Sequence, residues 1–365
     1  MTADRPHESW MDTLRVVVIA GAIVLHVGMA YILPINWYYT EHTTSLVWPV
    51  ALAFPALLGA FFGLGPLFFV AGFLSAGSLA RRGRAAFIRA RLVRLGGPLL
   101  VYVVIIGSLA RYIGDLRLGR AGDFLAYFVP DSFGPMWFVA ALLSISLAYA
   151  LLRGPRRPAA TSQPLRPAVL GIAAVSIGVG SWVVWQAFPF LSQTYLDPIF
   201  AEWPQGAGLF ALGVHAAETG WLDRVPSTLV RRLGGLAIAG LFALGGFMAV
   251  LLVSGQAGSL LAGNGWPAMV LALMDGAIAV TGTVAVVAWL RRRWTREGRL
   301  LSMAAKAAYA TYVSHPLSLT ILLVLLAPIA VAPELKFVIL APVAIPACFA
   351  VGYVLTRMPG LAGVL

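Results

Sequence analysis

The sequence has little charge and almost no cysteine. Charged residues make up 11% of its 365 positions, and Cys348 is the single cysteine. Soluble domains carry roughly 25% charged and 45–50% apolar residues, so a chain with 60% hydrophobic residues is neither a soluble enzyme, a coiled coil nor a disordered tail. One cysteine cannot form an intrachain disulfide and gives no information about the redox compartment. The composition predicts a protein that crosses a membrane several times.

Motifs of several familiar chemistries are also missing. The sequence has no metal-ligand spacing, no Walker loop, no Gly-x-Ser-x-Gly elbow and no dinucleotide fingerprint. Glycines such as Gly28, Gly59, Gly63 and Gly65 are better explained as helix-packing surfaces. We therefore expect no metal. The net charge of +12 lies in short clusters between apolar runs, which indicates orientation in a membrane and not nucleic-acid binding.

What the sequence has instead is long apolar runs. A helix needs about 20 apolar residues to cross a bilayer. On that basis we predict one all-α transmembrane domain over 1–365 with about ten spans, near 12–33, 50–80, 96–113, 135–152, 168–190, 199–217, 233–253, 266–290, 303–327 and 335–356. The first run lacks a cleavage site and is expected to be retained. The run 50–80 contains Pro49, Pro55 and Pro66, which favours a short interfacial helix followed by a kinked span.

Basic residues alternate between successive loops. Of the 26 Lys and Arg residues, 22 lie at the two ends of the chain or in every second loop, and the other four are Arg111, Arg117, Arg120 and Lys336. Because cytoplasmic loops carry an excess of Lys and Arg, we predict an even number of spans with both termini in the cytoplasm. The expected location is a cytoplasmic membrane of the bacterial type, in contact with lipids.

His26 is the clearest candidate for chemistry. Ionisable side chains within a span cost about 2.5–3.5 kcal/mol each, so they are functional candidates by default. Arg15 precedes His26 by eleven positions, and eleven steps of about 100° end within roughly 20° of three full turns. The two side chains therefore share one helix face, about 16 Å apart along the axis. A neutral imidazole is a natural general base; the alternative is a His bonded between helices, with Arg15 reaching the headgroups.

The basic segment after the second span suggests a phosphate site. Arg91 and Arg94 form an Arg-x-x-Arg pair on one face of a short helix, and Arg89 lies beside them. Guanidinium groups bind phosphate oxygens bidentately, so the pair suits a ligand such as a coenzyme A ester. The alternative is that these arginines only orient the protein in the membrane.

Four further residues are candidates with equally plain structural explanations. His315 either lines the cavity of His26 or is a structural His beside the kink expected at Pro316. Asp275 either orients a His or an Arg or makes a satisfied polar contact. Trp137 lies where an interfacial aromatic belt is expected. Tyr312 is a candidate because it lies three positions before His315 in the same segment.

Several motifs follow one another along the chain: Arg15 and His26 with ten residues between them, FFVAGFLSAGSLARRG (68–83), FIRARLVRLGGP (87–98), GPMWFVAALL (134–143) and YATYVSHP (309–316). Their order resembles that of acyltransferase family 3, which consists of integral-membrane O-acyltransferases. The resemblance covers nearly the whole chain. The chain has Ala71-Gly72-Phe73 where the family often has Ser-Gly-Phe, so a hydroxyl is missing there. Many members also carry an extracytoplasmic SGNH esterase-like domain, which we do not expect here.

The resemblance implies an activity and roles for these residues. An acyl group, with acetyl the first expectation, would pass from cytosolic acyl-CoA to a hydroxyl of a glycan or other saccharide-containing acceptor. Arg15 and His26 would be the essential pair, and Arg91 and Arg94 would contact the donor. His26 would act as general base or as transient acyl carrier.

Two other functions are compatible with the same residues. A proton-coupled transporter or exporter would use His26, Asp275 and His315 as a path, and a purely structural membrane subunit would need Arg15 and His26 only for folding. The acceptor is expected to be chosen by the outer loops, where Trp37, Tyr38 and Tyr39 either stack on sugars or belong to the interfacial belt.

Overall fold

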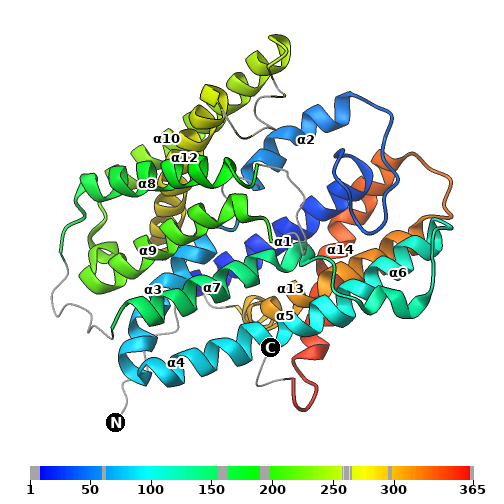
Figure 1. The fold of residues 1–365 in the computed structure, drawn as a ribbon, viewed down its shortest axis with the longest axis horizontal. Coiled ribbons are helices and arrows are strands. Elements are labelled where there is room, and N and C mark those ends of the chain that lie inside the picture. The colour runs from blue at the N-terminus through cyan, green and yellow to red at the C-terminus, as the bar shows by residue number, and fades with distance from the viewer. Residues whose placement is uncertain are drawn as a thin grey trace.

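A computed structural model of the protein describes residues 9–59, 63–154, 163–189, 198–256, 258, 263, 265–294 and 298–361. This part of the chain consists of helices and short connections and contains no strand (Figure 1). The all-α prediction is confirmed. Some expected features lie outside the described residues: Arg5, Arg156, Arg157 and Arg296, residues 60–62 of the span expected at 50–80, and residue 190 of the span expected at 168–190.

Eight described helices are long and apolar enough to cross a membrane. They are α1 (Ser9–Tyr31), the run Arg84–Arg117, the run Gly134–Leu152 that contains α7 (Trp137–Leu152), α8 (Pro167–Trp185), α10 (Ser227–Val253), α12 (Gly265–Arg293), α13 (Arg299–Leu326) and α14 (Pro333–Leu355). Each corresponds to one of the expected spans.

The other two expected spans correspond to shorter helices. The stretch 50–80 divides into α2 (Val47–Leu58) and α3 (Gly65–Arg82), with Pro66 in the first turn of α3. Proline has no N–H, and the N–H groups of the first turn have no partner within the helix, so a proline there favours a helix start. The stretch 199–217 is α9 (Trp203–Thr219), with 17 residues. The total of ten spans and the cytoplasmic side of the termini stay predictions.

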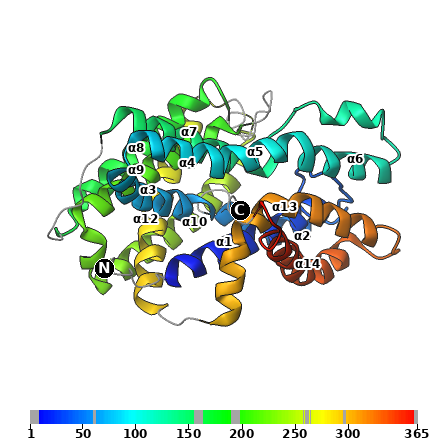
Figure 2. The same cartoon turned by 90° about the horizontal axis from the view of Figure 1, so that it is seen from below.

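The run Arg84–Arg117 is one long helix with two widened turns. Its α-helical parts are α4 (Arg84–Arg91), α5 (Gly97–Val101) and α6 (Gly107–Arg117), and π-helical turns at Leu92–Gly96 and Tyr102–Ile106 join them. Figures 1 and 2 show the three parts following one another along one side of the molecule. The helix begins 12 residues earlier than the span expected at 96–113, so Arg91 and Arg94 lie in the same helix as the membrane-crossing residues.

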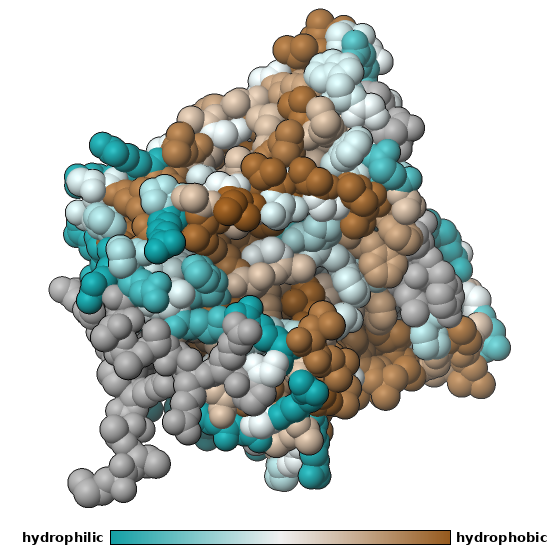
Figure 3. Space-filling model, turned by 60° about the vertical axis from the view of Figure 1, so that its left-hand side comes forward, coloured by the Kyte–Doolittle hydropathy of each residue, from teal (hydrophilic) through white to brown (hydrophobic). Residues whose placement is uncertain are grey.

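Exposed apolar side chains distinguish the outer helices from the inner ones. In its most apolar window α12 is 67% buried and α10 only 22%, and Phe242 and Val250 of α10 project outward. Hydrophobic side chains cover much of the face in Figure 3, and hydrophilic ones gather toward its edges. Soluble proteins seldom expose such continuous apolar surface, which agrees with a lipid environment.

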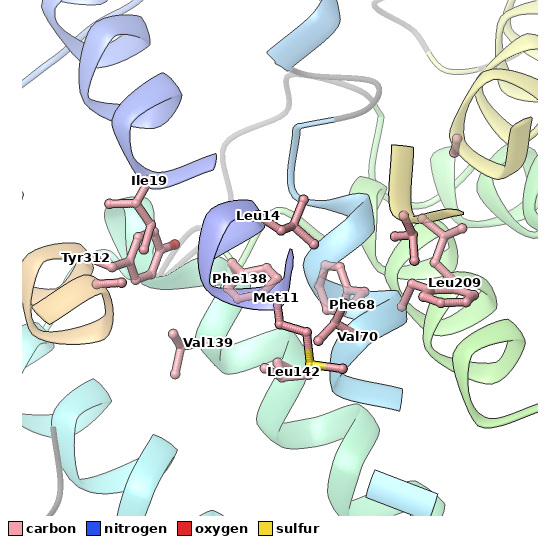
Figure 4. Packing of buried hydrophobic residues seen from close by; sticks show 14 of the residues in the cluster. Met11, Leu14, Ile19, Phe68, Val70, Phe138, Val139, Leu142, Leu209 and Tyr312 are labelled. Atoms are coloured by element: carbon pink, nitrogen blue, oxygen red, sulfur yellow. The ribbon is translucent and has the colours of Figure 1, made fainter. Parts of the chain in front are cut away.

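The N-terminal half of α1 packs in the middle of the bundle. Figure 4 shows Met11 and Leu14 beside Phe68 of α3 and Phe138 of α7, and all four side chains are buried. Farther along α1, Ile19 lies next to Tyr312 of α13. Because α1 also packs on α13 and α14, its C-terminal half carries His26 to the junction of these helices.

Candidate active site

His26 of α1 and His315 of α13 form a hydrogen-bonded pair. His26 Nδ1 and His315 Nε2 are 3.0 Å apart, and the ring planes differ by 15° with their centroids 5.1 Å apart. His315 is fully buried, whereas His26 is half-buried. The structure thus joins two residues that lie 289 positions apart in the sequence.

A further contact of His315 comes from its own helix. Its Nδ1 lies 2.7 Å from the backbone oxygen of Tyr312. The Tyr312 hydroxyl donates to the Pro135 carbonyl in the turn before α7, and the Tyr312 ring meets the Phe138 ring edge-on. Tyr312 therefore fixes the segment that holds His315 against α7. Trp137, the other candidate there, is half-buried and meets Phe138 edge-on with ring centroids 6.5 Å apart.

A loop between α1 and α2 covers the histidine pair. Trp37 stacks on His26 with ring centroids 4.2 Å apart and an angle of 18° between the planes. The hydroxyl of Tyr38 is bonded to that of Tyr102, in the second π-helical turn, and both approach the backbone of Gly134, which has a φ of 45°. Burial raises the pKa of the Tyr38 hydroxyl to about 12, so it stays protonated and can donate. The aromatic side chains at 37 and 38 face inward onto the site.

Polar contacts fix this loop to α14. Lys336 Nζ donates to both carboxylate oxygens of Glu41, at 2.8 and 2.7 Å, and Tyr39 donates to Glu41 at 3.1 Å. Thr43 donates to Glu334. The loop is therefore fixed to α14 through Glu41 and Thr43 and to the long helix through Tyr38.

The pair Arg91 and Arg94 lies in the first part of the long helix Arg84–Arg117, before Tyr102. Arg91 donates to Ser75 of α3 at 2.7 Å and lies over the ring of Phe87, 5.0 Å from its centroid. Arg94 is exposed, and its backbone oxygen accepts from the Tyr309 hydroxyl of α13 at 2.9 Å. One arginine of the pair thus points into the protein and the other toward solvent, which the Arg-x-x-Arg spacing alone does not indicate.

No carboxylate neutralises this cluster within the described residues. Arg15, Arg111, Arg120, Arg153 and Arg291 all pair with Asp or Glu there. Among the same described residues, the arginines of segment 81–94, Arg89 included, form no ion pair. A dense, uncompensated positive charge beside the helix bundle suits an anionic ligand.

Two predicted site residues have partners outside the histidine pair. Arg15 is bound to Asp12 one turn earlier, at 3.2 Å. Asp275 is buried and accepts from Gln205 of α9 at 2.6 Å, so its closest partner is neither a His nor an Arg. This arrangement matches the satisfied polar contact that we gave as its alternative explanation. In the described part of the chain, no three His, Cys, Asp or Glu side chains gather as metal ligands.

Several residues of the site carry no clear signal in the sequence. Tyr102 lies in an apolar run and Ser75 in a small-residue stretch, so neither differs from ordinary packing residues. The contacts of Trp37 with His26 and of Glu41 with Lys336 join distant segments. The one available signal is a Lys at 336 next to the start of an apolar run, where a charge needs a partner.

The fold and the site define a helical membrane protein with a hydrogen-bonded histidine pair and a separate arginine cluster. The sequence matches the acyltransferase 3 family, described as an acyltransferase domain, over residues 8–357. The chain therefore belongs to this family of membrane acyltransferases. No curated protein and no solved structure matches it.

Proposed function

We propose that the protein transfers an acyl group, acetyl in the first instance, from cytosolic acyl-CoA to a hydroxyl of a glycan or other saccharide-containing acceptor of the cell envelope. The observation that carries this proposal is the His26–His315 pair. One imidazole is half-buried, is held through Nδ1, and keeps Nε2 for a reacting group.

The proposed donor site is the arginine cluster. Arg91 and Arg94 bind phosphates of the donor, with Ser75 orienting Arg91. At about 1.5 Å of rise per residue, Arg94 lies about 12 Å along the helix from Tyr102, whose hydroxyl contacts the loop above His26. The long flexible arm between the phosphates and the thioester of acyl-CoA suits such a separation.

The proposed reaction needs one base and no metal. His26 Nε2 accepts the proton of the acceptor hydroxyl while that oxygen attacks the thioester carbonyl. The new carbon–oxygen bond forms, the carbon–sulfur bond breaks, and the proton passes from His26 to the thiolate of coenzyme A.

In a second route, His26 Nε2 attacks first and carries the acyl group. Mass spectrometry of protein quenched after mixing with acetyl-CoA alone separates the routes, because only the second adds an acetyl group to His26.

The direct test is coenzyme A release by the purified protein with acetyl-CoA and a saccharide extract of the cell envelope. We expect His26→Ala to lower kcat by about 100-fold or more, because general acid–base catalysis contributes about 10²–10⁴-fold. His215→Ala, which removes a half-buried His from α9, is the matched control and should leave the rate unchanged. An unchanged rate in His26→Ala would contradict the catalytic assignment.

The same assay tests the donor site. Arg94→Ala removes an exposed charge and should raise KM for acetyl-CoA about tenfold with little change in kcat, because a hydrogen bond to a charged group contributes about 1.5–3 kcal/mol. Arg299→Ala, at an exposed position in the first turn of α13, is the control. Equal KM values for the two variants would place the donor elsewhere.

A further inference from the structure

Pro316 frees a backbone acceptor beside the histidine pair. In an α-helix the N–H of residue i bonds to the carbonyl of residue i−4, so the partner of Tyr312 O would be the N–H of residue 316. Proline has no N–H. His315 Nδ1 lies 2.7 Å from this oxygen and replaces the missing donor.

This contact fixes the position of one proton. A carbonyl oxygen can only accept a hydrogen bond, so His315 Nδ1 must carry hydrogen. In the neutral ring the other nitrogen, Nε2, then has a lone pair and no hydrogen. His315 is fully buried, which disfavours a charged ring, and neither His315 nor His26 forms an ion pair with any carboxylate that the structure describes.

The tautomer of His315 determines the tautomer of His26. His315 Nε2 is 3.0 Å from His26 Nδ1, and because His315 Nε2 can only accept, His26 Nδ1 must donate. The remaining nitrogen of His26, Nε2, is then unprotonated. The stacked indole of Trp37, at 4.2 Å, holds the ring plane against rotation.

We propose that His315 is a positioning residue that sets the tautomer of His26. The Tyr312 carbonyl, free because of Pro316, fixes the proton of His315, and His315 in turn keeps Nε2 of His26 basic. A second group that fixes the tautomer of a catalytic His is a general device. The inference rests on the proposed function only for its effect on rate, since the proton positions can be measured without turnover.

The first test reads the tautomer directly. The protein contains five His residues, so ¹⁵N-His labelling gives a simple nitrogen spectrum in detergent micelles, and His26→Ala and His315→Ala assign the two rings. We expect hydrogen on Nδ1 and none on Nε2 for both rings at neutral pH. Hydrogen on His26 Nε2 in the wild-type protein would overturn the proposal, whatever the activity measurements give.

The second test compares two substitutions of His315. In His315→Gln the amide oxygen can take the place of Nε2 and still accept from His26 Nδ1, whereas His315→Met has similar bulk and no comparable acceptor. We expect kcat to fall about 100-fold in His315→Met and less than about tenfold in His315→Gln, with KM for acetyl-CoA unchanged in both.

The outcomes separate positioning from packing. Where His26→Ala loses activity, full kcat in His315→Met, or equal losses of kcat in His315→Met and His315→Gln when both fold, would overturn the proposal. Where His315→Met fails to fold, the nitrogen spectra of the wild-type protein and of His315→Gln decide. Loss of activity in neither His26→Ala nor His315→Met, with the expected nitrogen spectrum, would contradict the proposed function but leave the tautomer assignment standing.

Discussion

One of the groups that hold the loop covering His26 is a buried ammonium. Lys336 is 1% exposed, and its Nζ contacts the two carboxylate oxygens of Glu41 and the Ala327 carbonyl at 3.3 Å. All three N–H donors of the ammonium are thereby satisfied. The Glu41 side chain is 33% exposed, so the two ends of this ion pair have unequal access to water.

This asymmetry predicts unequal costs for the two single substitutions. Glu41→Gln leaves a buried charge without its counter-ion and should lower the free energy of unfolding by about 3 kcal/mol. Lys336→Met instead removes the buried charge itself, and Glu41 can turn to solvent, so we expect a loss of about 1 kcal/mol. Denaturant unfolding in detergent measures both.

The double variant supplies the control for this prediction. Glu41→Gln combined with Lys336→Met should be about as stable as Lys336→Met alone, because the buried charge is already gone. Equal losses in the two single variants, or additive losses in the double variant, would show that Lys336 is not buried with Glu41 as its counter-ion.

At the scale of helices, α3 and α9 pack with their backbones in contact. A Cβ atom on Gly72 would run into the carbonyl of Phe210, and one on Gly213 would run into the carbonyl of Phe69. Small residues at helix crossings permit such close approach in membranes. The glycines therefore act as packing surfaces here, as their distribution in the sequence indicates.

This packing predicts opposite effects of one substitution at two glycines. Gly213→Ala forces α3 and α9 apart and should cost about 1–3 kcal/mol of stability. Gly246→Ala is the matched control, because Gly246 is exposed in α10 and a Cβ there meets nothing within 4 Å. Alanine favours helix over glycine by about 1 kcal/mol, so Gly246→Ala should be neutral or stabilising in thermal unfolding. A Gly213→Ala protein as stable as Gly246→Ala would refute close contact of the two helices.

The helices themselves could be predicted from the sequence, but their partners could not. Apolar run length located all eight helices of spanning length in the described part of the chain, since it measures the cost of placing backbone and side chains in lipid. The contact of His26 with His315 depends on how α1 packs on α13, and nothing in either segment specifies that neighbour. Spacing placed Arg91 and Arg94 on one face, whereas the π-helical turn at Leu92–Gly96 and the contact with Ser75 give them different surroundings.

At the scale of the whole molecule, ion pairs connect loops that the charge pattern assigns to one side. Arg153 after α7 binds Glu218 at the end of α9, and Arg291 of α12 binds Asp223. The charge pattern places all four in the cytoplasm. For this to hold, α9 must cross the membrane although it has only 17 residues. The course of α9 therefore decides the topology of the C-terminal half.

The scarcity of cysteine makes this topology directly testable. Cys348 is fully buried, so the wild-type protein should not react with a membrane-impermeant maleimide and provides the background. Leu125, in the loop before α7, and Leu300, in the first turn of α13, are 72% and 82% exposed. We expect Leu125→Cys to be labelled in intact cells and Leu300→Cys only after the cells are permeabilised. The helices α7, α8, α9, α10 and α12 lie between these positions. An odd number of crossings puts the two cysteines on opposite sides, so equal labelling in intact cells would mean that α9 does not span the membrane.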